Sequence, residues 1–335
     1  MPRLSIVIPA MGETARLEAS LVSVLENCPA DTEVIVVLRE EYPDPYGLAD
    51  EEVRFVPAPH RAGLAACVNE GLSVCQSPIV HLLACGCEAT PGWAEEALVH
   101  FADERVAAVS PLVVEANVAP LRVITAGVDC DTAGRRVLAG CGLSFQAMST
   151  TAGFILGPTS LAAFYRTAAL EYLGTALEPS LGDVLCDLDL ALRLERIGYL
   201  ALSAPTSHVK CEASLVEDES PGYAQAVHAE RLYRRHAGPD GAWPLGFPHA
   251  ATIFGEMLRG LPRLHGLTQI AGRFRAALEG AKHRRLQQEL ALLEVAVEAD
   301  GLTTHDEPEH LRIDATHESQ QSRAVGDKSR ARTRA

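Results

Sequence analysis

The stretch LLACGCEATPGW, residues 82–93, decides the fold class of this 335-residue chain. It completes the short apolar run of residues 78–83, and its Thr-Pro-Gly-Trp end opens an amphipathic pattern that continues through Phe101. An apolar run, a tight turn and a helix in this order are typical of an α/β protein. The side chains of the turn are small or are thiols, so the turn offers a ligand few polar side-chain atoms.

The same alternation extends along the first third of the chain. Helical spacing of apolar residues predicts helices at about 17–28, 62–75 and 91–101, and apolar runs predict strands at 4–8, 34–37, 53–56, 79–83 and 106–109. Near-continuous apolar strands that alternate with helices predict a mainly parallel sheet with helices on both faces. Because ligands of such sheets bind outside the carboxyl ends of the strands, we expect the segments after Ile8, Val37 and Leu83 to converge on one crevice.

Composition agrees with a soluble protein of enzyme size. An apolar fraction of 47% in 335 residues is enough for one large α/β domain with a helical appendage. The net charge of −15 argues against a general role in nucleic-acid binding, which needs a basic face. No apolar run approaches the roughly 20 residues of a membrane span, and no signal-peptide pattern opens the sequence, so we expect a cytoplasmic chain. The nine cysteines have no framework spacing, which favours reduced thiols.

Several sequence blocks occur in an order that resembles one known family. These blocks are LSIVIP at 4–9, VIVV at 34–37, HRAG at 60–63 with NEG at 69–71, the 82–93 stretch, residues 163–174, and CDLDLALR at 186–193. Together, over about residues 3–211, they resemble the family-2 glycosyltransferases of the GT-A fold. The resemblance implies an α/β, GT-A-type, Rossmann-like domain over residues 1–215. Its nucleotide half would cover about residues 1–110 and its acceptor half about residues 111–215.

The resemblance also implies a function. The chain is expected to transfer a sugar from a nucleotide-diphosphate sugar to a glycan or lipid-linked acceptor, with inversion. The competing hypothesis is a non-catalytic GT-A-like protein that binds a sugar, a nucleotide or a partner enzyme. A third hypothesis is an α/β protein that binds a small molecule or acts as a scaffold. The donor base, the sugar, the acceptor and the linkage stay open.

The resemblance assigns one catalytic residue, Asp187, at the position of the family's general base. A carboxylate there can take the proton from the acceptor hydroxyl as the oxygen attacks the anomeric carbon. The structural alternative is a carboxylate near a helix N-terminus that interacts with the helix dipole. The resemblance assigns the other site residues only by their positions relative to the sequence blocks of the family. The donor side comprises Pro9, Ala10, Leu38, Arg39, Arg61, Gly63, Asn69, Ala84 and Gly86, and the acceptor side comprises Arg166, Asp189 and Arg193.

The family usually employs a divalent metal, Mg²⁺ or Mn²⁺, held by oxygen ligands against the donor diphosphate. Ala84 and Gly86 stand where two of those ligands belong, and Cys211 stands where many relatives have a histidine. After the second strand, Leu38 and Arg39 replace the usual nucleotide-reading Asp. Because these positions should meet in space, we expect donor binding to depend little on a metal.

Substitutes for the absent ligands exist in the sequence. Glu40, Glu41, Glu88 and His208 are candidate ligands, and Arg39 or Arg61 could neutralise a diphosphate without metal. The alternative interpretation of each of these residues, considered individually, is a solvated loop side chain. Three thiols, those of Cys85, Cys87 and Cys211, could form a soft-metal site, but the spacing supplies no fourth ligand, and buried thiols in a tight turn are the simpler interpretation.

Later segments carry weaker signals. Residues 111–160 are interpreted as turns and an acceptor-side loop, with Asp129 and Asp131 in a turn. The pair Gly157-Pro158 is expected to precede an apolar helix that carries Tyr165 and Arg166. On the 186–193 helix, Asp189 and Arg193 are spaced i, i+4, which suits an ion pair worth about 0.3 kcal/mol.

The last part of the sequence has a different character. Residues 216–300 predict a C-terminal helical extension, with helices at 221–236, 250–261 and 266–299. Residues 251–290 are basic and interleaved with apolar side chains, which predicts a peripheral contact at the inner membrane surface. The alternative is that these helices pack on the catalytic domain with their basic faces in solvent. Residues 301–335 are polar and are predicted to be disordered.

Overall fold

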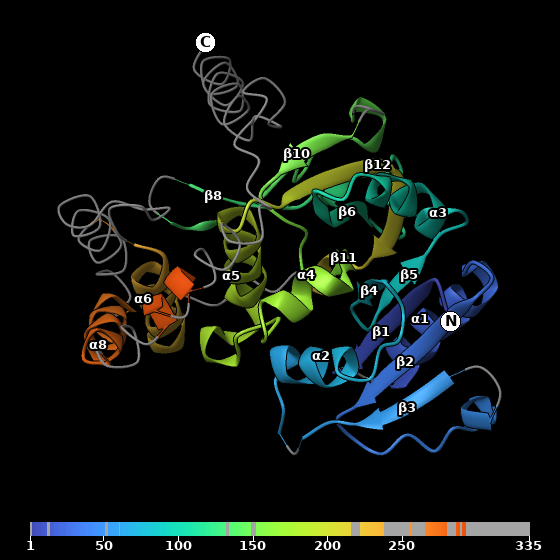
Figure 1. The fold of residues 1–335 in the computed structure, drawn as a ribbon, viewed down its shortest axis with the longest axis horizontal. Helices are drawn as coiled ribbons and strands as arrows, with labels where there is room; N and C mark the ends of the chain where they lie inside the picture. The colour runs from blue at the N-terminus through green and yellow to red at the C-terminus, as the bar shows by residue number, and fades with distance from the viewer. Residues whose placement is uncertain are drawn as a thin grey trace, which may run out of the picture.

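The computed structural model describes residues 2–11, 14–50, 53–59, 61–131, 134–148, 152–215, 222–237 and 265–279, together with 255, 286–288 and 290–292. These residues form an α/β domain around one large sheet, with α6 (Tyr223–His236) and α8 (His265–Ala277) packed together at its side (Figure 1). The predicted fold class is therefore confirmed. Among the described residues, no helix is long and apolar enough to cross a bilayer.

The central sheet is mixed and mostly parallel. Eight of its strands follow the order β10-β12-β6-β11-β4-β1-β2-β3. Strands β1 (Leu4–Ala10), β2 (Thr32–Leu38), β3 (Val53–Pro57) and β4 (Ile79–Leu83) are parallel. Strand β11 (Ala162–Arg166) is antiparallel to β4 and to β6 (Val106–Glu115), which is itself parallel to β12 (Leu200–Cys211). The carboxyl ends of all the strands except β11 and the short β5, β7 and β10 thus share one edge.

One face of the sheet is covered by α1 (Thr14–Asn27) and α3 (Trp93–Leu98), which continues as a 3₁₀ turn over Val99–Ala102. Ile6 and Ile8 of β1 are fully buried on this face, in one cluster with Leu21 and Trp93. The Trp93 indole N–H donates to Nε2 of the buried His81 at 3.2 Å, so the proton of this neutral imidazole is on Nδ1, beside the Ala163 carbonyl oxygen. Burial lowers the pKa of His81 to about 3.

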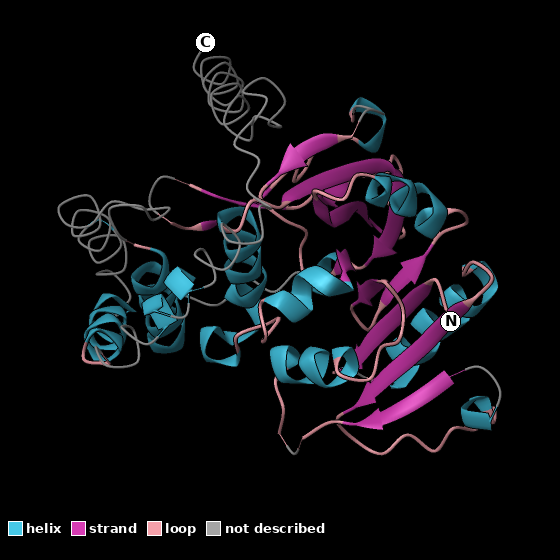
Figure 2. Cartoon of the chain, in the orientation of Figure 1, coloured by secondary structure: helices cyan, strands magenta, loops and turns pink. Residues whose placement is uncertain are grey.

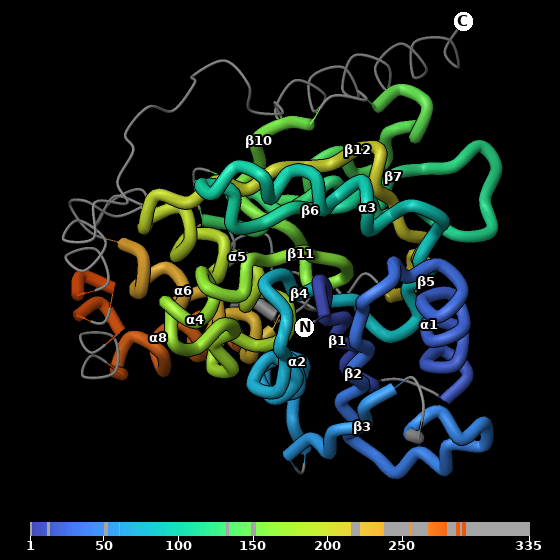
Figure 3. Tube along the Cα trace, turned by 45° about the vertical axis from the view of Figure 1, so that its right-hand side comes forward, coloured from blue at the N-terminus to red at the C-terminus, as the bar shows by residue number. Residues whose placement is uncertain are grey.

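The opposite face is covered by α2 (Leu64–Leu72), α4 (Thr167–Tyr172) and part of α5 (Gly182–Arg196). Val7 of β1 points to this side, as the alternation of a strand requires. Helix α2 approaches the sheet closely at Gly71, where an added Cβ would lie 2.5 Å from a Val7 methyl carbon. Figures 2 and 3 show helices on both sides of the sheet, with α1 and α2 flanking β1 and β2.

Between residues 111 and 166 the structure contradicts two of the predictions. The segment expected to be a helix carrying Tyr165 and Arg166 is strand β11, and the helix, α4, begins only at Thr167. A strand buried on both faces is a continuous apolar run, which periodicity alone does not separate from a buried helix. Residues 111–160, predicted as turns and a loop, contain several strands: β6 continues to Glu115, followed by β7 (Val123–Thr125), β8 (Val128–Cys130), β9 (Arg136–Leu138) and β10 (Gly153–Ile155). Strands β8 and β9 pair with each other in a separate two-stranded sheet.

Strand β12 has no counterpart among the predicted elements. It pairs with β6 along most of its length and with the short strand β5 (Cys87–Ala89) at its end. Its sequence mixes polar and apolar residues around Pro205, and its register against β6 shifts between Ala204 and His208. Long-range pairing, rather than a local pattern, therefore defines this strand.

Beyond the sheet, α6 packs against α5 through Leu232 and Tyr233, which share a buried cluster with Leu188 and Leu192. The predicted helix at 221–236 corresponds to α6, and α8 covers the start of the predicted 266–299 helix. Most of the predicted 250–261 helix and the predicted disordered tail, 301–335, lie outside the described residues.

Candidate active site

A crevice opens at the carboxyl edge of the sheet, where β1 and β4 end and α5 begins. Pro9 and Met11 line it from the β1 side, and Ala84 and Cys85 line it from the β4 side. The remaining wall comprises Leu64, Arg136, Leu138, Ser160, Leu161, Asp183, Val184 and Leu215. The expected convergence of the segments after β1 and β4 is therefore observed.

The turn after β4 is built from residues without oxygen-bearing side chains. Gly86 has φ +95°, and its N–H donates to Ser20 Oγ at 2.8 Å. A Cβ on Gly86 would lie 2.6 Å from Leu215 Cδ1, so a larger residue would also have to displace that side chain. Hard cations need several oxygen ligands, and Ala84, Cys85 and Gly86 supply none from their side chains. The side chains of these three residues therefore offer no oxygen ligand to Mg²⁺ or Mn²⁺.

The thiols around this turn are buried. Cys87 and Cys211 are directly opposite each other on β5 and β12. A side-chain hydrogen bond with the neighbouring Cys211, together with burial, raises the pKa of Cys87 well above its usual range. Two buried thiols that face each other fit the interpretation as core thiols. Among the described residues, no group of three His, Cys, Asp or Glu side chains is arranged to hold a metal ion.

Asp187, the predicted base, lies deep at the side of the crevice and is only 1% exposed. Its carboxylate forms a two-point ion pair with Arg136 of β9: Nε donates to Oδ1 at 3.0 Å and a terminal nitrogen donates to Oδ2 at 2.6 Å. The backbone N–H groups of Ser160 and Leu188 donate to the same carboxylate at 3.2 and 2.7 Å. Asp187 therefore fixes Arg136 in the crevice wall.

Asp183 is a second acid on α5, one helical turn before Asp187. It is half-buried and lines the crevice directly. Its Oδ1 accepts the backbone N–H of Leu64 at 2.9 Å, which joins the start of α5 to the start of α2. Gly63 allows this approach, since a Cβ there would lie 2.9 Å from the same oxygen.

The predicted donor-side residues fall into two groups. Pro9 and Ala84 line the crevice, and Ala10 and Gly86 are their neighbours along the chain. Gly63 touches its edge through Asp183. Arg39 donates to the Met11 carbonyl oxygen at 3.0 Å, which brings it to the rim rather than into the lining.

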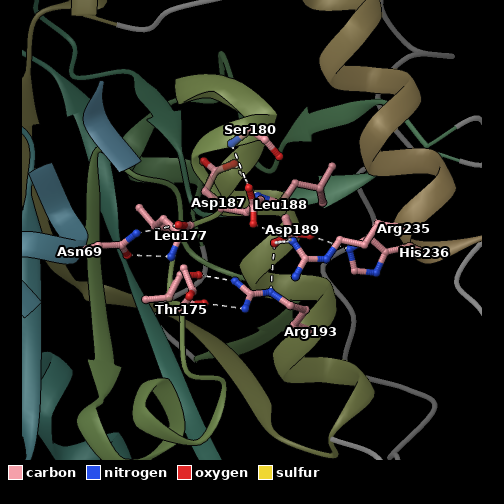
Figure 4. A network of polar contacts seen from close by, with 12 residues as sticks. Asn69, Thr175, Leu177, Ser180, Asp187, Leu188, Asp189, Arg193, Arg235 and His236 are labelled. Carbon is pink, nitrogen blue, oxygen red and sulfur yellow. Dashed lines mark hydrogen bonds and ion pairs between the residues drawn. The ribbon is translucent and has the colours of Figure 1, made fainter. Parts of the chain in front are cut away.

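The other donor-side residues, Leu38, Arg61 and Asn69, do not line the crevice. Leu38 packs against the core beside α1. Arg61 is exposed, with φ +59°. Asn69 forms two hydrogen bonds with the backbone of Leu177, of 2.7 and 3.0 Å, and so fastens α2 to the loop before α5 (Figure 4).

The proposed substitutes for metal ligands lie outside the lining. Glu88 is exposed on β5 and borders surface hollows beside α1. Glu40 and Glu41 are exposed after β2, and Glu40 lies 4.0 Å from Arg39. The ring of His208 is tilted against Phe145 with 5.2 Å between centroids.

The predicted acceptor-side residues also lie away from the crevice. Arg166 is at the opposite edge of the sheet, where it donates to the backbone carbonyl groups of Phe101, Asp103 and Val106. Asp189 is 0% exposed and faces α6 instead of the crevice. Arg193 is 2% exposed and donates to the carbonyl groups of Thr175 and Ala176.

Asp189 is the centre of a sealed charge cluster between α5 and α6 (Figure 4). Arg193 and Arg235 both approach its Oδ2 at 3.0 Å, and the His236 imidazole contacts its Oδ1 at 2.9 Å. Burial alone would raise the pKa of Asp189, but the two guanidinium groups and the histidine hold it below its usual range. Burial lowers the pKa of His236, against the opposing effect of Asp189. The predicted i, i+4 pair exists, inside a larger network.

Sequence reasoning missed two charged residues of the crevice. Asp183 precedes Asp187 by four positions, a spacing that places both on one helix face once the helix is known to begin at Gly182. Arg136 was part of a predicted turn, and its pairing with Asp187 joins positions 51 residues apart. The sequence contains a signal for Asp183, whereas it contains none for Arg136.

Comparisons with known proteins agree with this architecture. Residues 5–127 match the family model described as glycosyl transferase family 2. A search of curated proteins finds no match.

Solved structures that are similar to this chain include a mannosyltransferase and GalNAc-T7. A mannosyltransferase from Pyrobaculum calidifontis, in complex with GDP-Man and Mn²⁺, is 18% identical with a TM-score of 0.51, covering 91% of this chain and 88% of its own. GalNAc-T7, with UDP, GalNAc and Mn²⁺, is 15% identical with a TM-score of 0.54, covering 76% of this chain. The match spans only 54% of the GalNAc-T7 chain. At these identities the likeness shows the fold alone, a GT-A fold.

Proposed function

We propose, from the glycosyl transferase family 2 domain that residues 5–127 form, that this chain transfers a sugar from a nucleotide-diphosphate sugar to an acceptor hydroxyl, with inversion. The observation that carries the proposal is the crevice at the carboxyl edge of the sheet. There, the ends of β1 and β4 meet an acid-bearing helix, α5. Ligands of open α/β sheets bind at this edge, and a carboxylate at hand can serve as the base for an attacking hydroxyl.

The donor class is supported by two relatives whose structures hold a nucleotide or a nucleotide sugar, UDP and GDP-Man. Both of those structures also hold Mn²⁺. For this chain we propose donor binding that depends little on a divalent ion, because the turn after β4 lacks oxygen-bearing side chains and Arg136 brings a fixed positive charge to the crevice.

The test is calorimetric titration of the full chain with a panel of UDP- and GDP-sugars, each with EDTA and with Mn²⁺, followed by detection of released UDP or GDP. We expect affinity for at least one donor and less than a threefold change on adding Mn²⁺. A large gain with Mn²⁺ that EDTA abolishes would contradict the metal-independent part alone. Binding without release or transfer would favour the second candidate function, a non-catalytic protein that binds a nucleotide sugar.

A lipid-linked acceptor and a peripheral membrane contact remain part of the proposal. One observation favours them: Leu267, Ile270, Phe274 and Leu278 of α8 and its end are 38–67% exposed at helical spacing. In contrast, Arg273 and Arg275 contact Glu230 and Glu279, which reduces the charge they offer an anionic surface. Lys282, Arg284 and Arg285, which also belong to the basic segment 251–290, lie outside the described residues.

Co-sedimentation with vesicles of graded anionic lipid content, at low and high ionic strength, tests this contact. Each basic residue near such a surface contributes about 1 kcal/mol, so the basic segment should give weak, salt-sensitive binding. The comparison variant carries Phe274→Ser and Leu278→Ser. Equal recovery of both proteins with every vesicle would leave α8 as a packing element.

A further inference from the structure

Two acids of α5 are candidates for the catalytic base in the crevice. Asp183 and Asp187 are four residues apart, so both point to the same side of the helix. Asp183 is in the first turn and lines the crevice, whereas Asp187 is one turn deeper and 1% exposed. The resemblance to the family favours Asp187 as the base, but the hydrogen bonds of the two carboxylates favour Asp183.

The Asp187 carboxylate has no accepting position left. A carboxylate has about four lone-pair sites, two on each oxygen. Arg136 Nε and the Leu188 N–H donate to Oδ1, at 3.0 and 2.7 Å. A terminal nitrogen of Arg136 and the Ser160 N–H donate to Oδ2, at 2.6 and 3.2 Å. A base must come within hydrogen-bond distance of the proton it takes, and these four donors occupy the positions from which Asp187 would do so.

The Asp183 carboxylate is open by comparison. Within the described residues it accepts a single hydrogen bond, from the Leu64 N–H to Oδ1 at 2.9 Å. This bond holds the carboxyl group at the junction of α2 and α5 without occupying Oδ2. Asp183 therefore combines a fixed position, access to the crevice and unused acceptor capacity, which is what a general base requires.

We propose that Asp183 is the catalytic base and that Asp187 is a positioning residue that holds Arg136 in the crevice wall; this inference rests on the proposed function. Asp183 takes the proton of the acceptor hydroxyl as that oxygen forms its bond to the anomeric carbon. The bond from the anomeric carbon to the diphosphate oxygen breaks, and its electron pair leaves with the nucleoside diphosphate. The Arg136 guanidinium contributes positive charge to the crevice where this negative charge develops.

The test uses two isosteric variants of the full chain, Asp183→Asn and Asp187→Asn. In Asp183→Asn the amide oxygen can still accept the Leu64 N–H, so the junction of α2 and α5 is kept while the proton acceptor is lost. In Asp187→Asn the amide nitrogen faces donors, so Arg136 is released. Because the acceptor is unidentified, transfer to water is measured as release of UDP or GDP from UDP- and GDP-sugars, with melting temperature and calorimetric donor affinity measured alongside.

We expect Asp183→Asn to lower kcat roughly 10²- to 10⁴-fold, with donor affinity and melting temperature near those of the parent protein. Asp187→Asn should lower the melting temperature and raise KM for the donor, with kcat within about tenfold, because it acts through Arg136. Glu96→Gln, at an exposed acid in the first turn of α3, is the control and should match the parent protein. Loss of kcat in Asp187→Asn with unchanged stability and affinity, and near-normal kcat in Asp183→Asn, would overturn the assignment.

A second measurement does not require turnover. Coupling of carboxyl groups to glycine ethyl ester by a carbodiimide, followed by mass spectrometry, reports which acids are accessible. We expect modification of Asp183, protection of Asp183 by a bound UDP- or GDP-sugar, and no modification of Asp187. Modification of Asp187 in preference to Asp183 would contradict the proposal. If the parent protein neither binds nor cleaves any donor of the panel, the proposed function fails and the inference fails with it, an outcome distinct from the pattern that exchanges the two acids.

Discussion

The acids of helix α5 belong to two groups of ion-paired side chains, one at the crevice and one sealed between α5 and α6. The crevice group consists of Asp183, Asp187 and Arg136, and the sealed group consists of Asp189 with Arg193, Arg235 and His236. Asp187 and Asp189 are two residues apart, so their side chains diverge by about 200° around the helix. One points to the crevice side and the other to α6. The contrast shows that which acid is available for chemistry depends on what faces the helix and not on residue type.

A substitution in the sealed group should lower the free energy of unfolding more than one in the crevice group. Asp189→Asn leaves two buried guanidinium groups without their shared counter-charge, and breaking one partner of a buried ion pair typically costs 3–5 kcal/mol. We therefore expect a loss of about 3–5 kcal/mol in the free energy of unfolding by urea, an order of magnitude above the 0.3 kcal/mol of an isolated surface pair. Asp183→Asn is the reference and should cost under about 1 kcal/mol. Similar costs for both variants would erase the distinction between the two groups.

A substitution of Arg136, in the crevice group, should have an effect of intermediate size on stability. The Arg136 side chain is 12% exposed, so Arg136→Gln removes a partly buried two-point bond to a carboxylate. Hydrogen bonds to charged groups contribute about 1.5–3 kcal/mol, and we expect a destabilisation of that size, together with weaker donor binding in calorimetry. The matched control is Arg135→Gln, on the adjacent residue, whose 53% exposed side chain pairs with Asp131 and should matter by less than about 0.5 kcal/mol. Equal effects of the two changes would refute a special role for Arg136.

The smallest expected effect is the pH dependence of the unfolding free energy, which comes from buried histidines outside the crevice. Among the crevice-lining residues none is a histidine, whereas His236 belongs to the sealed group and His81 to the core. In the folded protein the pKa of His81 is lowered to about 3, and that of His236 is also lowered, both by burial. A depressed folded pKa means that the unfolded chain binds the proton first. The contribution of these neutral histidines to the unfolding free energy is therefore complete above the unfolded pKa of about 6.5, and it declines as the pH falls below that value.

Each such group contributes a slope of at most about 1.4 kcal/mol per pH unit to the unfolding free energy below pH 6.5. Urea denaturation at several values between pH 6.5 and 5 should give a shallower slope for His81→Leu than for the parent protein, whatever its absolute stability. Asp183→Asn should leave the slope in this window unchanged. An unaltered slope in His81→Leu would show that His81 titrates normally in the folded state.

The sequence predicted best those parts of the fold that local patterns define. Strands β1 to β4 and helices α1 and α2 were identified because each is a short apolar run or a helical stripe bounded by turn residues. The identity of Ala84 and Gly86 at the turn after β4 was also evident from sequence, and with it the lack of oxygen-bearing side chains in that turn. Strand β11 was mistaken for helix because four of its five residues are buried, which removes the alternation that identifies a strand.

By itself, the sequence determined that this protein is an α/β chain with a glycosyltransferase-like order of blocks, a ligand edge at the ends of its parallel strands and an acid-bearing helix near that edge. Only the tertiary structure decided which acid of that helix is open. Arg136 comes to Asp187 from 51 residues away, and His236 comes to Asp189 from 47 residues away. Local patterns report the periodicity of one segment, whereas the hydrogen-bond partners of a buried carboxylate are set by how distant segments pack.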